Sequence, residues 1–307
     1  MTDADFILWQ KLIEDVTGLW IPQHRKPFLL TQLQNRVRVL GLEDYASYYE
    51  KLIRQTLGKT EWALLIDLLT VHETRFFRDA MAMELVKDFT HKRIENQKTR
   101  SHKARSAITR NIMEKTDTKC VMQFWSVGCA TGEEVYSLAM MLENLNETIP
   151  SGYHFYFGVK GTDISFPSLA VAREAKYPSS RERTIPINLF ESFANKTANN
   201  QFEIDPQLKE KVCFVQENLG ELETIPFQTF DVIYCQNVLI YFKSERKKMI
   251  LDALVKRLNK NGLLVLAPGE ATNWEHPEML KCDISDCLAF TKKMTNTETQ
   301  WRDYGKK

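Results

Sequence analysis

The chain has 307 residues, 43% of them hydrophobic and 26% charged, with 41 Lys and Arg against 40 Asp and Glu. This composition is typical of globular proteins and excludes collagen-like, disordered and membrane-embedded chains. At roughly 150 residues per domain, the length predicts about two domains. The six cysteines include no CxxC pair, which excludes a zinc ribbon and a thioredoxin-type motif.

The sequence carries no recognisable targeting signal. Its first ten residues contain acids where a signal peptide has basic residues, and no apolar run approaches the roughly 18 residues of a membrane span. We therefore expect a cytoplasmic protein with reduced thiols and no transmembrane segment. The histidines lack the spacing of metal ligands, so no metal site is expected.

Residues 1–90 repeat apolar side chains at helical spacing, which predicts a small all-α domain. Gly18 stands where a helix C-cap is expected, and Pro27 suits the first turn of the next helix. That second helix has an expected buried stripe of Leu30, Leu33, Val37 and Leu40. Arg36 and Arg38 lie off the stripe and are expected to face solvent. They could also form a docking surface for an acidic partner.

Residues 91–120 are expected to form a basic linker or insertion. Between Lys92 and Lys119 the sequence has nine Lys and Arg against three Asp and Glu. A run with this charge pattern is usually a solvated segment. Because the whole chain has a net charge of only +1, nucleic acid is not an expected partner.

The region 121–294 alternates short β-rich runs with helical stretches, which predicts an α/β domain with a mostly parallel, doubly wound sheet. The predicted strands are residues 121–127, 155–162, 212–216, 230–235 and 263–267. The predicted helices are residues 133–145, 166–173 and 244–258. In this fold class ligands bind beyond the carboxyl ends of the strands. A polar tail is expected at residues 295–307.

A turn rich in small residues follows the first predicted strand and leads into a helix. Gly128 and Gly132 allow a ligand to approach the backbone closely. Their spacing fits neither GxGxxG nor a phosphate-binding P-loop, and no Lys follows. Glu133 and Glu134 at the helix start disfavour a pyrophosphate there and suit a cationic or neutral ligand, such as a sulfonium cofactor.

Polar residues also follow two other predicted strands. Asp163 stands where an acidic residue of a nucleoside-binding βαβ unit accepts hydrogen bonds from ribose hydroxyls, although Asp also favours turns and helix N-caps. Asn237 and Tyr241 follow the strand at 230–235 and could touch substrate. Their structural alternative is an Asn that caps the turn and a Tyr that packs its ring.

Five motifs occur in one order: HETRFFR (72–78), SVGCATGEEVYSLAM (126–140), GTDIS (161–165), QENL (216–219) and FDVIYCQNVLIYF (230–242). With them, the chain resembles the CheR-type chemotaxis-receptor protein-glutamate O-methyltransferases from about residue 5 to residue 292. The resemblance implies a Rossmann-like S-adenosylmethionine-dependent methyltransferase domain after a small all-α domain. It also implies a small antiparallel β insert at about residues 177–211.

The family transfers a methyl group from S-adenosylmethionine to glutamate side chains of chemoreceptor helices for sensory adaptation, leaving S-adenosylhomocysteine. The resemblance therefore implies cytoplasmic receptor helices as partners and association with receptor arrays at the inner membrane. The implied cofactor contacts are His72, Thr74, Arg78, Gly128, Glu133, Asp163, Asn218, Leu219 and Asn237. Arg78 and Tyr241 are the implied catalytic residues, nearest the transferred methyl and the incoming carboxylate.

The chain departs from the family pattern at three places. His72 replaces the usual Asn of the first motif, and Gln236 replaces the usual Arg before Asn237, which removes a charge from the substrate mouth. The basic stretch at residues 92–119 is longer than the usual connection. Such a variant fits the branch of the family that serves type IV pilus signalling.

Two other functions remain open at this point. The first is a non-catalytic adaptor that binds S-adenosylmethionine and docks on receptor arrays through the basic second helix. The second is an RNA or small-molecule methyltransferase, since fold alone does not fix substrate.

Overall fold

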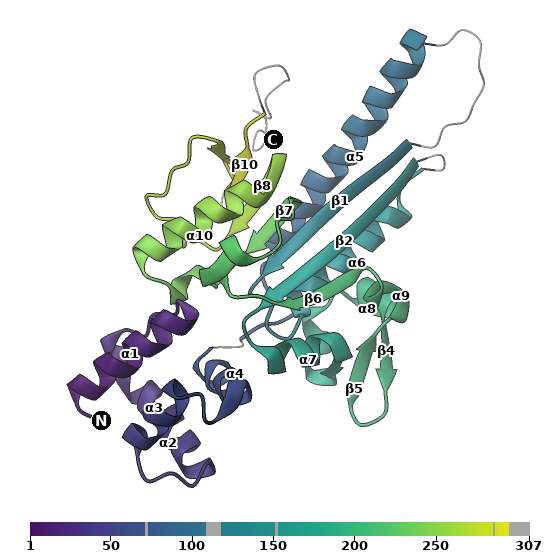
Figure 1. Cartoon of the computed structure of the whole chain (residues 1–307). Coiled ribbons are helices and arrows are strands. Elements are labelled where there is room, and N and C mark those ends of the chain that lie inside the picture. Colours follow the sequence, from purple (N-terminus) through teal and green to yellow (C-terminus); the bar gives the residue numbers. More distant parts are fainter. Residues whose placement is uncertain (71–72, 109–117, 151–152, 285, 295–307) are drawn as a thin grey trace.

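A computed structural model describes residues 1–70, 73–108, 118–150, 153–284 and 286–294 (Figure 1). Residues 1–70 form the helices α1 (Asp3–Thr17), α2 (Lys26–Val39), α3 (Tyr45–Ile53) and α4 (Gly58–Leu69), with the 3₁₀ turn η1 (Gln23–Arg25) before α2. Thr2 caps α1 through a capping box, and Gly18 ends the helix with φ +77° while its N–H donates to the Glu14 carbonyl. The all-α prediction is confirmed.

The prediction that Arg36 faces solvent is wrong. Its Nε and Nη2 donate to the two carboxylate oxygens of Glu61 on α4 at 2.9 and 2.6 Å, and the Tyr48 hydroxyl donates to Glu61 at 2.6 Å. The Arg36 and Glu61 side chains are 13% and 5% exposed. A buried carboxylate needs such donors, so Arg36 turns inward to meet it. Arg38 is exposed, as expected, and Leu29 rather than Leu30 is buried beside Leu33.

The next helix, α5 (Ala80–Ile108), crosses the domain limit expected at residue 90 and takes in much of the expected linker at 91–120. Apolar side chains recur along it at helical spacing, at Met83, Val86, Phe89 and Ile94, and all of them are buried. They pack this part of the helix in the core beside the sheet. Residues 109–117 and the expected tail at 295–307 lie outside the described residues.

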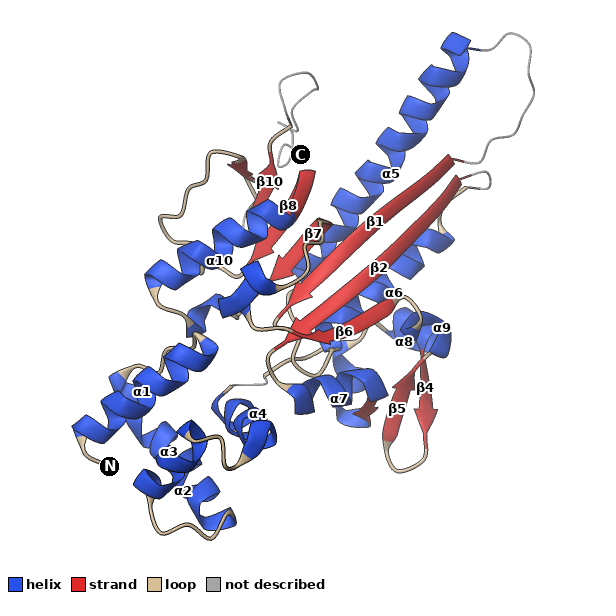
Figure 2. Ribbon diagram, viewed as in Figure 1, coloured by secondary structure: helices blue, strands red, loops and turns tan. Residues whose placement is uncertain are grey.

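Within the described residues, a seven-stranded sheet has the order β6-β2-β1-β7-β8-β10-β9 (Figure 2). Its strands are β1 (Thr118–Val127), β2 (Tyr153–Asp163), β6 (Val212–Gln216), β7 (Phe230–Cys235), β8 (Leu258–Leu266), β9 (Met279–Lys281) and β10 (Leu288–Lys292). The first five in this order pair in parallel, whereas β10 and β9 are antiparallel. The predicted α/β class is confirmed.

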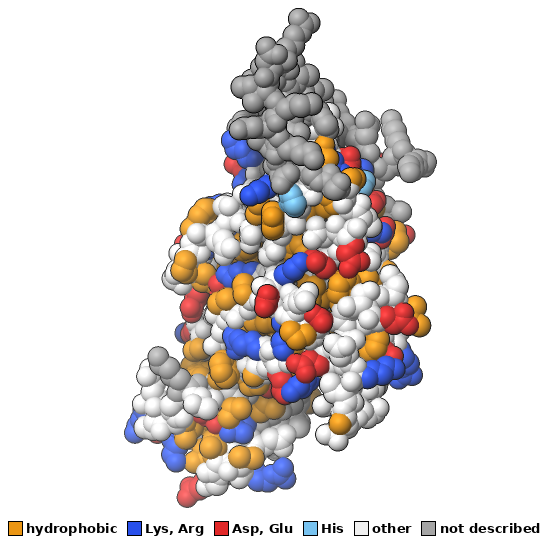
Figure 3. Space-filling model, turned by 90° about the vertical axis from the view of Figure 1, so that its right-hand side faces the viewer, with side chains coloured by type: hydrophobic (Ala, Val, Ile, Leu, Met, Phe, Trp, Pro, Cys, Tyr) orange, Lys and Arg blue, Asp and Glu red, His pale blue; other side chains and the backbone are white. Residues whose placement is uncertain are grey.

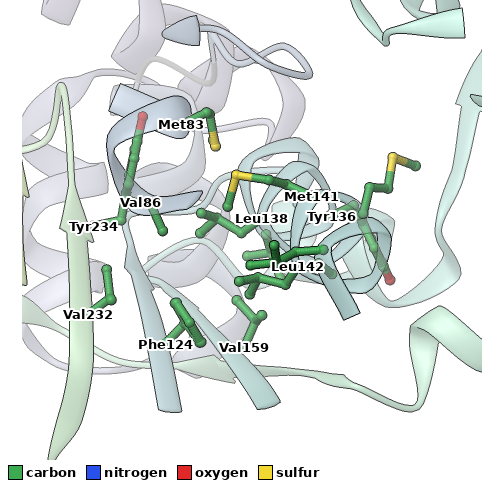
Figure 4. Close-up of a cluster of buried hydrophobic side chains, with 14 of the residues drawn as sticks. Met83, Val86, Phe124, Tyr136, Leu138, Met141, Leu142, Val159, Val232 and Tyr234 are labelled. Carbon is green, nitrogen blue, oxygen red and sulfur yellow. The ribbon is translucent and has the colours of Figure 1, made fainter. Parts of the chain in front are cut away.

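Helices cover both faces of this sheet. On one face α5 and α6 (Glu133–Glu147) pack on β1, β2 and β7, where Phe124 and Val232 point toward α6 and α5 (Figure 4). Neighbouring strand residues point to the opposite face, where Trp125 and Ile233 pack with α10 (Ser244–Arg257) and the N-terminal helices. Burial on both faces is typical of parallel strands.

The predicted insert is a small antiparallel sheet of β3 (Lys176–Pro178), β5 (Gln201–Ile204) and β4 (Ala194–Thr197), following α7 (Phe166–Glu174). It also contains η2 (Ser179–Thr184), α8 (Ile187–Phe193) and α9 (Pro206–Lys209). Tyr177 and Phe202 of the insert contact Phe76, and their ring centroids lie 5.0 and 5.8 Å from the Phe76 ring centroid. The insert thereby packs against the segment that carries Thr74 and Arg78.

Polar contacts hold the N-terminal helices against the sheet domain. The Trp20 N–H donates to the Tyr241 carbonyl at 2.8 Å, and Lys243 pairs with Glu14 at 2.8 Å. Lys243 also lies over the Trp20 ring, 3.8 Å from its centroid. These contacts bring the N-terminal helices to the carboxyl edge of the sheet.

Candidate functional site

Two adjoining cavities lie at the carboxyl ends of β1, β2, β6 and β7. The first encloses about 610 Å³ of empty space, part of it open to solvent, and the second about 500 Å³. Gly128, Ala130 and Asn237 line both cavities, so the two lie side by side.

Except for Glu133 and His72, the residues implied by the family resemblance divide between these cavities. The first cavity is lined by Gly128, Asp163, Asn218, Leu219, Asn237 and Tyr241. The second is lined by Thr74, Arg78, Gly128 and Asn237. Thr17, Leu19 and Thr70 add a wall from the N-terminal part to the first cavity. His72 lies outside the described residues, so its placement stays a prediction.

The glycine turn that lines both cavities requires its glycine. Gly128 has φ +73°, and a Cβ there would lie 2.3 Å from the Val238 side chain. A side chain at this position would therefore collide with the loop after β7. Ala130 has φ +46°, and its N–H donates to Asp163 Oδ2 at 2.8 Å.

Asp163 fixes this turn while lining the first cavity. Besides its bond to Ala130, it accepts the Ser165 N–H through Oδ1 at 2.8 Å. Both the predicted ribose role and the alternative turn role fit this geometry, because each carboxylate oxygen can accept more than one hydrogen bond.

Glu133 and Glu134 begin α6 in different surroundings. Glu133 is fully buried, accepts a hydrogen bond from Thr131 Oγ1 at 2.6 Å and pairs with Arg181 of η2. Burial raises the pKa of Glu133, while Thr131 and Arg181 act to lower it. Arg181 also donates to the Thr74 carbonyl at 2.8 Å. The charge that we expected Glu133 to present to a ligand is therefore offset by Arg181.

Glu134, rather than Glu133, lines the second cavity. Its Oε1 accepts a hydrogen bond from Ser126 Oγ at 2.7 Å. Burial raises its pKa to about 8, against the opposing effects of Ser126 and of the nearby Arg78 guanidinium. Near neutral pH this carboxyl is therefore mostly protonated.

Arginines line the mouth of the second cavity. Arg75 and Arg78 are both exposed, and Arg78 Nη1 donates to the Glu73 carbonyl at 2.7 Å. Gln236 also lines this cavity but is buried, and its Nε2 donates to Asp79 at 2.8 Å while its Oε1 accepts the Tyr234 hydroxyl at 3.0 Å. With Gln236 in place of the usual Arg, Arg75 and Arg78 are the cationic side chains among the described residues that line the second cavity.

A buried carboxylate that we did not predict shapes the loop after β7. Glu270 is 3% exposed, and its two oxygens accept the N–H groups of Leu239 and Ala267 at 2.9 and 3.1 Å. This loop contains Asn237, which has φ +60°, and Tyr241. Burial raises the pKa of the half-buried Tyr241, an effect that the positive charge of Arg25 and Arg78 opposes.

The far end of the first cavity follows β6. Asn218 caps η3 (Leu219–Thr224), since its Oδ1 accepts the Gly220 N–H at 2.9 Å. Its Nδ2 donates to the Val16 carbonyl of α1 at 3.3 Å. Glu217, just before it, pairs with Lys160 at 2.6 Å.

Comparison with known proteins identifies the family. The model described as CheR methyltransferase, SAM binding domain (SAM being S-adenosylmethionine) matches residues 72–286, and the CheR methyltransferase, all-alpha domain matches residues 4–70. The chain belongs to the CheR methyltransferase family. It is therefore an S-adenosylmethionine-dependent methyltransferase.

Several curated relatives carry the name chemotaxis protein methyltransferase. One from Borreliella burgdorferi is 27% identical over 261 residues, which cover 85% of each chain. One from Escherichia coli is 28% identical over 282 residues, covering 91% of this chain and 87% of the relative. Chemotaxis protein methyltransferase 1 of Pseudomonas aeruginosa is 23% identical and covers 91% of this chain and 95% of its own.

Metal binding and membrane-spanning helices can be assessed for the described residues. There, no group of three or more His, Cys, Asp or Glu is arranged to hold a metal ion. None of the described helices is long and apolar enough to cross a membrane.

Proposed function

We propose that this protein transfers the methyl group of S-adenosylmethionine to glutamate carboxylates on the cytoplasmic helices of bacterial chemoreceptors. The products are glutamate methyl esters and S-adenosylhomocysteine. The observation that carries the proposal is the pair of adjoining cavities, of which the first is lined by Asp163 and Asn218 and the second by Arg75 and Arg78. The names of the relatives support chemoreceptors as the substrates.

We assign the nucleoside part of the cofactor to the first cavity. Asp163 would hold the ribose, Asn218 and Leu219 would flank the adenine, and Asn237 would close the site. Gly128 lines both cavities, and its missing side chain leaves room for Val238 in the loop after β7. Thr74 and Arg78, together with His72, would surround the amino-acid end. Glu133 lines neither cavity, so its contact with the cofactor stays a prediction.

The acceptor needs no general base. A glutamate side chain has a pKa near 4.3 in model peptides, so it is already ionised at neutral pH. The bound cofactor supplies an activated methyl group on a sulfonium. The task of the protein is to align the acceptor, and good alignment can lower the barrier by roughly 7 kcal/mol or more.

The second cavity can orient an anionic acceptor. Arg78 would bind the carboxylate through charge-assisted hydrogen bonds. Tyr241, which lines the adjoining first cavity, would orient one carboxylate oxygen through its hydroxyl. Glu134 lines the same cavity, but its pKa of about 8 leaves it mostly neutral at pH 7. The incoming glutamate would thus meet little repulsion from Glu134.

The alternatives have weaker support. The adaptor hypothesis relied on a basic face of α2, and Arg36 of that face is paired with Glu61 in the interior. The nucleic-acid hypothesis needs a basic surface, whereas Lys and Arg alternate with Asp and Glu on the described face in Figure 3. Service in type IV pilus signalling, association with receptor arrays and a cytoplasmic location stay predictions.

Methyl transfer from labelled S-adenosylmethionine to purified receptor cytoplasmic fragments tests the proposal. We expect label on the receptor band that is released as methanol at alkaline pH, as an ester requires. Fragments with every candidate glutamate changed to alanine are the control and should stay unlabelled. Label that survives alkali, or labelling of the glutamate-free fragment, would contradict glutamate specificity.

A further inference from the structure

Glu217 has a carboxylate oxygen without a partner among the described residues. Its side chain is 7% exposed, and Oε1 pairs with Lys160 Nζ at 2.6 Å. Oε2 is buried and receives no hydrogen bond within the described part of the chain. A buried acceptor left without a donor is costly, so this oxygen favours a ligand that supplies one.

The position of Glu217 limits what that donor can be. Glu217 lines the first cavity directly after β6, and its N–H donates to the Asp163 carbonyl at 3.1 Å. It thus stands between the residue proposed for the ribose and the pair, Asn218 and Leu219, proposed for the adenine. A carboxylate accepts hydrogen bonds and cannot donate them, so a ligand carbonyl oxygen facing Glu217 would be repelled, whereas an N–H or O–H group could donate to it.

We propose that Glu217 Oε2 accepts a hydrogen bond from the exocyclic amino group of adenine and so selects an adenine nucleoside over one with a carbonyl at that position. The inference rests on the proposed function, because it assigns the cofactor to the first cavity. Lys160 holds the other oxygen and thereby fixes the orientation of the carboxylate. Glu217 is thus a specificity-determining residue of the cofactor site.

Calorimetry with two product analogues tests this assignment. S-adenosylhomocysteine carries the amino group, and S-inosylhomocysteine carries a carbonyl in its place. We expect the wild-type protein to bind the adenosyl compound about 10- to 100-fold more tightly, the range of one charge-assisted hydrogen bond. In Glu217→Gln, whose amide can turn either group toward the base, the two affinities should come within a few-fold of each other.

Glu223→Gln is the matched control, because it removes a carboxylate from an 87% exposed side chain of η3 and should leave both affinities unchanged. If Glu217→Gln does not fold, Glu217→Asp keeps the charge but withdraws the acceptor, and its adenosyl affinity should fall by about 10-fold. Equal wild-type affinities, or full discrimination in either Glu217 variant, would overturn the assignment. If the wild type binds neither compound, the proposed function fails with it.

Discussion

Arg181 of the inserted subdomain pairs with the fully buried carboxylate of Glu133 at the start of α6. The same guanidinium donates to the Thr74 carbonyl at 2.8 Å. One side chain therefore links the insert, the segment before α5 and the glycine turn. Arg181 lines neither cavity itself. Because it holds Thr74, which lines the second cavity, the insert still contributes to the shape of the proposed site.

Replacing Arg181 with Ala should destabilise the protein by about 1–3 kcal/mol, because Glu133 would be left buried without its cation. The free energy of unfolding in urea measures this effect. Arg183→Ala is the control, since Arg183 lies in the same 3₁₀ helix and is exposed. In Arg181→Ala combined with Glu133→Gln, much of the lost stability should return. Equal effects of the Arg181 and Arg183 variants would show that the pair contributes no stability.

The N-terminal part offers a similar comparison on one helix. Arg36→Ala should lower the free energy of unfolding by about 3–5 kcal/mol, because it strands the Glu61 carboxylate in the interior. Arg38 lies two residues away and is exposed, so Arg38→Ala should change stability by less than about 0.5 kcal/mol. Thermal or urea unfolding of both variants tests the difference. A mild effect of Arg36→Ala would mean that Glu61 is protonated or rehydrated in the variant.

The helices and strands could be predicted from the sequence more completely than the contacts between them. Four predicted strands lie within observed ones, because alternating and continuous apolar runs are local signals. β9 and β10 were missed, since strands of three and five residues depend on the neighbours they pair with. The continuity of α5 was missed because the charged residues from Lys92 onward hid the apolar stripe of Met83, Val86, Phe89 and Ile94.

The same limit applies to the site. Motif residues such as Asp163 and Asn237 are next to strand ends and could be found from the sequence. Arg36, Arg181 and Glu270 could not, because their partners are 25, 48 and 31 residues away in the chain. For Arg181 there was a partial signal, since a carboxylate buried at a helix start needs a donor from elsewhere.

Asp163→Asn should weaken binding of S-adenosylhomocysteine by about 10-fold or more, because the amide loses one acceptor for the ribose hydroxyls. Calorimetry measures the affinity. Glu174→Gln is a suitable control for the loss of a negative charge, because Glu174 is exposed at the end of α7. Circular dichroism must show a folded variant, since Asp163 also accepts the Ala130 and Ser165 N–H groups. A folded Asp163→Asn protein with wild-type affinity would exclude the ribose contact.

Arg78→Ala should abolish methyl transfer to receptor fragments while S-adenosylmethionine still binds. The reason is that the proposed acceptor loses its charged hydrogen-bond donor at the mouth of the second cavity. Initial rates and calorimetry on the same preparation separate the two effects. Arg78→Lys keeps the charge but loses the forked donor geometry. Its rate of methyl transfer should therefore lie between the rates of the wild type and of Arg78→Ala. Near-normal turnover by a folded Arg78→Ala protein would rule out the clamp.

Glu134 should make stability fall as pH rises. Its pKa is raised by burial to about 8 in the folded protein, so between about pH 4.5 and pH 8 the folded state keeps a proton that the unfolded state releases. The free energy of unfolding therefore decreases across this window. Glu134→Gln cannot lose a proton, and its stability should fall less steeply with pH over the same range. Urea unfolding of both proteins at several pH values gives the two slopes, and identical slopes would mean that Glu134 titrates alike in both states.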